Sequence, residues 1–296
     1  MTRSSWSRRG GLVALLPAAL VLSGCSMTGD STGAQAVRLG WPDPITEEAE
    51  QMLGIYVGSW IAALAVGLFV WGLIFIAMIR YRRKDDVLPR QVRYNLPVEV
   101  LYTVVPFVIV AVLFYWTAVI QEDVVDLSDD PDVQIGVVGF QWNWQFSYLQ
   151  EQADGDDADS EPDLVPVAEI VGRPGQPAVL TLPSDRTVRF IETSPDVIHS
   201  FWVPEFLFKR DVIPGRENQF EVTMSPDAEG VYVGRCAELC GVDHSRMNFE
   251  LRVVSPEEYE QYLADAVGAG GRLQGTSDSP AAGGDVNALG ATAETG

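Results

Sequence analysis

Two cysteines, a histidine and a methionine lie within twelve positions of the chain, in the segment CAELCGVDHSRM at 236–247. Their thiol, imidazole and thioether groups are ligands that transition metals accept. A second histidine, His199, lies 37 residues upstream of Cys236, and the 296 residues contain no further histidine and only one further cysteine, Cys25. Because both residue types are this scarce, their grouping indicates one site.

Three interpretations of this group compete. A disulfide between Cys236 and Cys240 suits an exported protein, but so small a loop adds little stability and leaves both histidines without a role. Zinc accepts two thiolates and two imidazoles, yet the spacing is Cys-x3-Cys instead of the usual Cys-x2-Cys, and zinc has no use for Met247. Copper fits the composition better, because thiolate, imidazole and a weak thioether ligand are typical of redox-active copper sites. A single blue-copper ion needs one cysteine, whereas two thiolates can bridge two copper ions and leave one histidine for each.

The sequence around this group has the alternation of β-strands. Apolar side chains occupy every second position from Met247 to Val253, which predicts a strand with one buried face and gives Met247 a packing role besides any metal role. Further short β-type runs separated by turn signals are 133–148, 177–183, 187–193, 218–224 and 230–235. This spacing is typical of a sandwich or a barrel. A capped short helix is predicted to follow at 255–266.

Two apolar stretches precede the strands. Leu53 to Ile79 has 27 residues without a charge, and Val100 to Ile120 is also uncharged. Both are long enough to cross a bilayer, and Pro106 bends such a helix without excluding it. The loop between them, 80–93, has six basic and two acidic residues, so the positive-inside rule predicts that it faces the cytoplasm.

The N-terminus has the features of an export signal. Basic residues precede an apolar run at 11–22 that is too short to span a bilayer. The sequence LSGC at 22–25 resembles a bacterial lipobox, which predicts a lipid on Cys25 after cleavage. Together with the basic loop, this predicts a multi-pass protein of the bacterial cell membrane with both termini and the metal group on the outer side.

Acidic residues dominate the rest of the chain. The net charge is −21, and residues 121–255 hold 26 Asp and Glu against 9 Lys and Arg. Such a surface repels nucleic acid and favours a basic protein partner, whose reaction we expect to slow as salt rises. The acidic segment 150–163 is predicted to be an unpacked loop, and the Gly- and Ala-rich residues 268–296 are predicted to be disordered.

The motif Cys-x-Glu-x-Cys-x3-His-x2-Met with an upstream histidine resembles the copper-A domain of subunit II of cytochrome c oxidase, a haem-copper oxidase. The resemblance rests on HSFWVPEFLFKRDVIPGRENQ and YVGRCAELCGVDHSRM, and it extends to GFQWNWQF and to both apolar stretches, about residues 50–260. It implies a two-helix transmembrane hairpin followed by an all-β cupredoxin-like Greek-key barrel.

The resemblance also implies a role for each matching residue. Cys236 and Cys240 would bridge two copper ions, with His199 and His244 as terminal ligands. Met247 would be a weak ligand to one ion and the backbone carbonyl of Glu238 to the other. The Glu238 side chain would help to bind a Mg or Mn ion shared with subunit I.

Outside the ligand set, the resemblance implies that Trp142 accepts electrons from a c-type cytochrome, while Trp144 is taken as an aromatic of the sheet. Glu99, seven residues before Pro106, would stand at the mouth of a proton channel into subunit I. Asp196, Lys209 and Asp211 also fall on motif positions. Phe140 departs from the pattern, because a histidine is expected there.

The predicted function is therefore that of subunit II of a cytochrome c oxidase, a respiratory oxidoreductase and proton-pumping translocase. The chain would receive electrons at a dinuclear copper centre and pass them to haem in subunit I, which reduces oxygen; the chain has no oxygen chemistry alone. The alternatives are a nitrogen-oxide reductase subunit and a copper-binding lipoprotein. The predicted organisation is a signal peptide (1–24), a linker (25–51), the hairpin (52–121), the copper domain (122–256), a short helix (257–267) and the tail (268–296).

Overall fold

The computed structural model describes residues 37–83, 86–88, 91–152, 163–173 and 175–273. The predicted signal peptide with Cys25, and most of the acidic segment and of the tail, lie outside the described residues. The chain divides into two units after Asp43. In the described part of the first unit, Arg38 forms an ion pair with Asp43 at 2.9 Å. The second unit begins at Pro44 and contains two long helices and two β-sheets.

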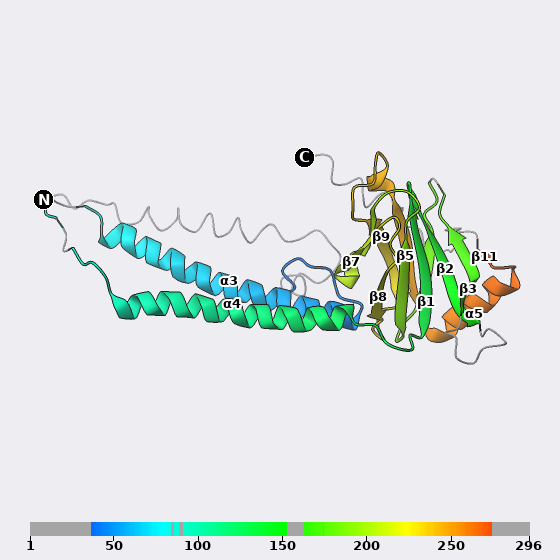
Figure 1. Cartoon of the computed structure of the whole chain (residues 1–296), viewed down its shortest axis with the longest axis horizontal. Helices are drawn as coiled ribbons and strands as arrows, with labels where there is room; N and C mark the ends of the chain where they lie inside the picture. The colour runs from blue at the N-terminus through cyan, green and yellow to red at the C-terminus, as the bar shows by residue number, and fades with distance from the viewer. Residues whose placement is uncertain (1–36, 84–85, 89–90, 153–162, 174, 274–296) are drawn as a thin grey trace, which may run out of the picture. The chain divides into compact units, whose positions relative to one another are not determined.

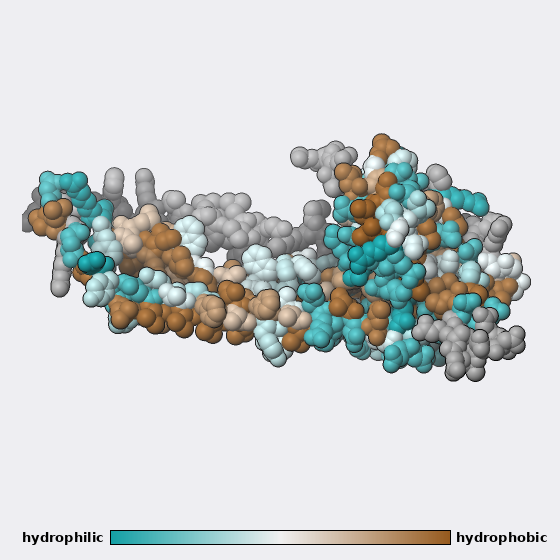
Figure 2. Space-filling model, viewed as in Figure 1, coloured by the Kyte–Doolittle hydropathy of each residue, from teal (hydrophilic) through white to brown (hydrophobic). Residues whose placement is uncertain are grey.

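The two long helices are α3 (Glu47–Arg80) and α4 (Leu96–Val125), and both are long and apolar enough to cross a membrane. Helix α3 begins five residues before the predicted hairpin because the Thr46 side chain caps it by accepting a hydrogen bond from Ala49 N–H at 3.1 Å. Helix α4 continues through Pro106, as expected for a membrane helix. Figure 2 shows apolar side chains along both helices, in contrast to the more hydrophilic sheets.

Polar contacts attach one end of each helix to the same strand, β8 (Asn218–Thr223). The Glu48 carboxylate accepts the Thr223 N–H at 3.0 Å. Just beyond α4, Ser128 N–H donates to Glu221 Oε2 at 3.0 Å. Since the start of α3 and the end of α4 both reach β8, and the two helices contact each other, they form an antiparallel hairpin.

Eleven strands of the described residues form two sheets (Figure 1). The first sheet has the order β11-β3-β2-β1-β5-β8 and the second has the order β4-β10-β9-β6-β7. The remaining strands of the first sheet are β1 (Val133–Phe140), β2 (Asn143–Gln152), β3 (Asp163–Val171), β5 (Thr187–Thr193) and β11 (Arg272–Leu273). The second sheet consists of β4 (Val179–Pro183), β6 (His199–Val203), β7 (Phe208–Val212), β9 (Gly230–Cys236) and β10 (Asn248–Val254).

An aromatic core joins the two sheets. Phe146 of β2 packs edge-on against Phe249 of β10 at 5.1 Å between ring centroids, and Phe249 stacks on Phe201 of β6 at 4.9 Å. All three side chains are at most 1% exposed. The predicted fold class, a transmembrane hairpin followed by an all-β cupredoxin-like domain, is confirmed, with the predicted barrel flattened into two separate sheets.

The predicted buried face of β10 is confirmed, because Met247, Phe249, Leu251 and Val253 are all at most 2% exposed. Its other face is not simply solvated. Glu250 is 4% exposed and lies 3.4 Å from Arg252, so the second face is also partly covered.

Two predictions of irregular chain are wrong at their edges. Residues 150–152 and 163 of the predicted acidic loop belong to β2 and β3, because backbone pairing extends the hairpin while its side chains stay exposed. Residues 272–273 of the predicted disordered tail form β11, which pairs in parallel with β3. The short helix α5 (Pro256–Gly268) is capped by Ser255, whose hydroxyl accepts the Glu258 N–H at 3.3 Å.

Candidate metal centre

Three neighbouring strands of the second sheet bring the candidate ligands together at one end of the strands. His199 is the first residue of β6, Cys236 is the last residue of β9, and Met247 directly precedes β10. Since β9 lies between β6 and β10 and is antiparallel to both, these three positions meet at the same end. The loop from β9 to β10 adds Cys240 and His244, the latter in the short 3-10 helix η2 (His244–Arg246).

The sulfur and nitrogen atoms of these residues converge. Cys236 Sγ lies 3.8 Å from Cys240 Sγ and 3.9 Å from His199 Nδ1. Cys240 Sγ lies 3.6 Å from His244 Nδ1 and 3.7 Å from Met247 Sδ. The Cys236 thiol also donates to the Glu238 carbonyl oxygen at 3.2 Å.

The arrangement excludes the disulfide interpretation for this structure, since bonded sulfurs lie about 2.05 Å apart. It does fit metal ions. Metal–sulfur bonds of about 2.3 Å in tetrahedral geometry put two sulfur ligands about 3.8 Å apart, which is the observed separation of the thiols. His199, Cys236 and Cys240 alone place their ligand atoms within 4.8 Å of one another.

Burial and hydrogen bonding control the protonation of this group. Burial raises the pKa of the Cys236 thiol, but hydrogen bonds with His199 and with the backbone at Glu238 and Ser200 outweigh this and lower the pKa to about 7. Burial and the charge on Cys236 together raise the pKa of Cys240 to about 12. One thiol therefore ionises near neutrality and keeps its neighbour protonated until a cation replaces the proton.

Asp196 orients His199. Its Oδ1 lies 2.9 Å from His199 Nε2, which leaves Nδ1 facing Cys236 Sγ. Burial lowers the pKa of His199, but hydrogen bonds to Cys236 and Asp196 raise it overall. A carboxylate on the outer nitrogen of a metal-binding histidine fixes the tautomer and the ring direction. The sequence had given Asp196 only a motif position, and the structure provides this contact.

Trp142 lies against the backbone of the cysteine loop, the segment between Cys236 and Met247. Its indole N–H donates to the Cys240 carbonyl at 3.2 Å, and Gln141 Nε2 donates to the same oxygen at 2.7 Å. Gly241 has φ +129°, and an added Cβ there would lie 2.9 Å from Trp142 Nε1, so only glycine permits this contact. Gln141 was missed by the sequence analysis, because a glutamine beside a tryptophan carries no spacing signal.

Trp144 occupies the interior side of the site. It is fully buried, donates its indole N–H to the Met247 carbonyl at 3.3 Å and packs edge-on at 6.2 Å from the His199 ring. The expectation that Trp144 is an aromatic of the sheet agrees with this position. Met247 is likewise fully buried while its sulfur faces Cys240, so packing and ligand geometry coincide at this residue.

The other predicted residues do not join the cluster. The Glu238 side chain is exposed, although its carbonyl contacts Cys236. Lys209 and Asp211 are exposed on β7. Glu99 lies in the first turn of α4, where its carboxylate accepts the Asn95 N–H at 2.9 Å. With 1.5 Å of rise per residue, Glu99 is about 39 Å along the helix from Val125, at the end that β8 does not contact.

The fold and the site together define a class of protein: a membrane-anchored cupredoxin-like domain with a buried thiolate and imidazole site suited to copper. Comparison with known proteins gives the family. The model of the cytochrome c oxidase subunit II periplasmic domain matches residues 133–254, and that of the subunit II transmembrane domain matches residues 34–117.

Relatives agree along most of the chain. It is 49% identical over 284 residues to a probable cytochrome c oxidase subunit 2 of Streptomyces avermitilis, covering 87% of each chain. It is 39% identical to the cytochrome c oxidase subunit 2 of Mycobacterium bovis, over 88% of this chain and 82% of the relative. The crystal structure of the periplasmic domain of subunit II of the Bradyrhizobium japonicum oxidase is 27% identical, with a TM-score of 0.36 over 48% of this chain and 99% of that one.

The chain belongs to the cytochrome c oxidase subunit II family, and it is thus a membrane component of a haem-copper oxidase, an oxidoreductase complex. Membership of this family implies a copper centre, association with other oxidase subunits and a cytochrome c-like electron donor. His199, Cys236 and Cys240, whose ligand atoms all lie within 4.8 Å of one another, fit that copper centre.

Proposed function

We propose that this chain accepts electrons one at a time from a c-type cytochrome at a dinuclear copper centre and passes them to haem in subunit I, where oxygen is reduced to water and protons are pumped. The observation that carries this proposal is the convergence of two thiols, two imidazole nitrogens and a thioether at 3.6–3.9 Å. A copper carrier needs fewer ligands, and the relatives are named as oxidase subunits, not as nitrogen-oxide reductases.

Each candidate ligand has one place in this centre. Cys236, Cys240, His199 and His244 would hold the two copper ions, with Met247 and the Glu238 carbonyl as weaker ligands. When bound, copper with such ligands supplies reversible one-electron exchange. The chain's own contribution is a preorganised, largely dry site: His199 and Met247 are fully buried, and Cys236 and Cys240 are at most 8% exposed. Asp196 holds the His199 ring in the direction that binding requires.

Trp142 is the residue where electrons enter. Its indole is half-buried and is joined through its N–H to the backbone of Cys240, which gives a short connection between the protein surface and a bridging ligand. Trp144 lies behind the site and has no exposed surface, so it is not available to a docked donor.

Two carboxyl groups serve other parts of the oxidase. The exposed Glu238 side chain, next to the copper ligands, is free to bind a Mg or Mn ion whose remaining ligands come from subunit I. Glu99 stands at the mouth of a proton channel into subunit I, where its place in the first turn of a membrane helix exposes it to the cytoplasm.

The chain crosses the membrane twice, with the loop 80–93 in the cytoplasm and the copper domain outside. The six basic residues of that loop support this direction. The signal peptide is removed, and Cys25 carries a lipid that anchors the N-terminus to the outer face. Its protein partners are subunit I, other oxidase subunits and the donor cytochrome; nucleic acid is not a partner of so acidic a chain.

Replacement of Trp142 tests the route. In the assembled oxidase, we expect Trp142→Leu to slow oxidation of a reduced c-type cytochrome roughly 100-fold, because the reacting groups lose their alignment, while the copper content stays the same. Trp41→Leu is the matched control, since Trp41 is also half-buried but belongs to neither sheet. Equal rates for the wild-type and Trp142→Leu oxidases would refute this role.

A further inference from the structure

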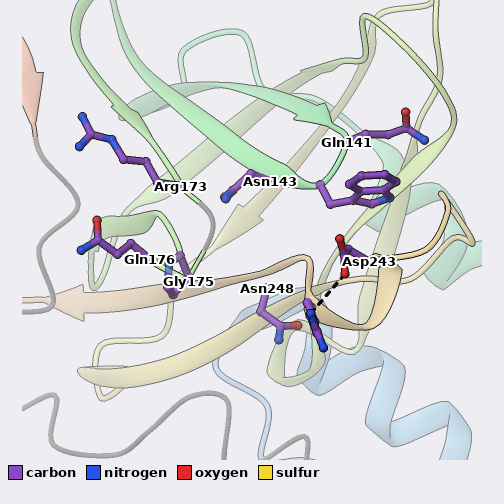
Figure 3. A pocket seen from close by; sticks show the side chains of 10 residues that line it. Gln141, Asn143, Arg173, Gly175, Gln176, Asp243 and Asn248 are labelled. Carbon is purple, nitrogen blue, oxygen red and sulfur yellow. Dashed lines mark hydrogen bonds and ion pairs between the residues drawn. The ribbon is translucent and has the colours of Figure 1, made fainter.

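A pocket of about 330 Å³ adjoins Trp142. Three segments form its walls: the turn from β1 to β2, the loop from β3 to β4, and the end of the cysteine loop with η2. Figure 3 shows Arg173 and Gln176 on one side of this pocket and Asp243 on the other, with Asn143 between them.

The pocket is built into the fold. Gly172 N–H donates to the Trp144 carbonyl at 2.9 Å, and a Cβ on Gly172 would lie 1.8 Å from Asn143 Oδ1. Arg173 and Gln176 exchange two backbone hydrogen bonds of 2.8 Å. The loop that carries Arg173 is thus fixed against the start of β2, next to Trp142.

The lining of this pocket is more basic than the domain around it. Two guanidinium groups, Arg173 and Arg246, line the pocket together with one carboxylate, Asp243, and neutral amides. The Arg246–Asp243 pair is long, at 3.5 Å, and the Arg246 side chain is 82% exposed, so water screens it strongly. In a domain where acidic residues outnumber basic ones 26 to 9, this pocket is a local site for an anion.

Carboxylate is the anionic group that best fits. Arginine binds carboxylates in paired, charge-assisted hydrogen bonds, and the amides of Asn143 and Gln176 offer further donors. A volume of about 330 Å³ is at the lower limit of small-molecule sites, so it suits one side chain and not a whole cofactor. Any group bound here lies directly beside the indole of Trp142.

We propose that this pocket receives an aspartate or glutamate side chain that the donor cytochrome carries beside its exposed haem edge. This inference rests on the proposed function, in which Trp142 accepts the electron. The acidic surface elsewhere steers basic parts of the donor. Arg173 and Arg246 fix the register of the docked complex, because opposite charges attract and mismatched like charges repel.

The test uses the assembled oxidase and two soluble c-type cytochromes, one with carboxylates beside its haem edge and one with lysines there. We expect Arg173→Glu and Arg246→Glu each to raise the KM for the acidic-edged cytochrome about tenfold, with kcat unchanged. For the lysine-edged cytochrome, we expect the KM of both variants to stay the same or to fall.

Arg186→Glu is the matched control, because it makes the same charge change and its side chain is 41% exposed. Arg186 directly precedes β5, at the end of the first sheet away from the turn between β1 and β2. We expect it to change either KM less than about twofold. Two results would overturn the inference while the wild-type enzyme oxidises both cytochromes normally. The KM could stay unaltered in both pocket variants, or Arg186→Glu could raise the KM as much as they do. Failure of the proposed function has a different signature, since the wild-type enzyme would then oxidise neither cytochrome.

Discussion

Glu192 is a carboxyl group inside the β-sandwich, and its replacement by glutamine should stabilise the domain. The side chain points inward from β5, in line with Val188 and Phe190, and all three are fully buried. Neither of its carboxyl oxygens has a hydrogen-bond partner among the described residues. Burial raises its pKa to about 9, although the charge of Arg210 acts in the opposite direction.

The size of the effect follows from this pKa. Below pH 4.5 the carboxyl is protonated in both the folded and the unfolded chain, so its ionisation takes nothing from the free energy of unfolding. As the pH rises towards 9, the unfolded chain ionises while the folded chain keeps its proton, and stability is lost at about 1.36 kcal/mol per pH unit. At pH 7 the cost is about 3 kcal/mol. Glu192→Gln keeps the shape of the side chain and removes this cost.

The assay is thermal unfolding of the purified full chain in detergent, followed by tryptophan fluorescence at pH 5 and pH 7. We expect Glu192→Gln to raise the midpoint at pH 7 by roughly 10 °C, and most of this gain to disappear at pH 5. Glu151→Gln is the control, because Glu151 is exposed on β2. A gain of the same size at both pH values, or no gain at pH 7, would refute the reasoning.

Four further predictions concern the electron path, the core, the hairpin and the surface. Gly241→Ala should push the Trp142 indole away at a cost of about 1–3 kcal/mol and slow cytochrome oxidation in stopped-flow measurements without loss of copper; an unchanged rate would contradict the contact. Met247→Ala should reduce the free energy of unfolding by about 2–5 kcal/mol and Met247→Leu by less than about 1.5 kcal/mol in urea titrations, whereas equal losses would count against a packing role. Glu99→Gln should lower proton uptake in proteoliposomes and leave the copper spectrum unaltered, and a normal uptake rate would argue against a channel mouth at this residue. Cytochrome oxidation should slow as salt is raised; a flat response would suit a donor held permanently in a larger assembly.

Sequence patterns predicted the parts of the fold that depend on periodicity. The alternation from Met247 to Val253 gave the buried face of β10, and the uncharged runs gave both helices. Strands β3, β6 and β7 were not predicted. Pro166 interrupts the pattern of β3, and neither HSFWV in β6 nor FKRDV in β7 alternates apolar with polar side chains.

The candidate ligands could be grouped from the sequence because cysteine and histidine are rare in this chain, and the structure brings their sulfur and nitrogen atoms together. The residues that support them could not. Asp196 touches His199 only because a turn before β6 folds back, and Gln141 reaches Cys240 across 99 positions of sequence. Glu192 lies on the same face of β5 as Val188 and Phe190, and the pattern alone does not distinguish a buried carboxyl there from the end of the buried face.

The arginine pocket was also invisible to composition. The acidic total of the domain predicts a uniformly basic partner, but Arg173 and Arg246 come from loops 73 positions apart that meet only in the folded sheet. The charge of the pocket lining therefore differs in sign from the average of the domain, and the donor is expected to be mixed in charge where it docks.

Metal analysis with electron paramagnetic resonance on the purified, copper-loaded full chain tests the central claim most directly. The ligand geometry predicts two copper ions per chain that share one unpaired electron in a mixed-valence state, with the signal lost when Cys236 or Cys240 is replaced by serine. One copper ion per chain, bound zinc, or an oxidised Cys236–Cys240 pair that takes up no copper would contradict it.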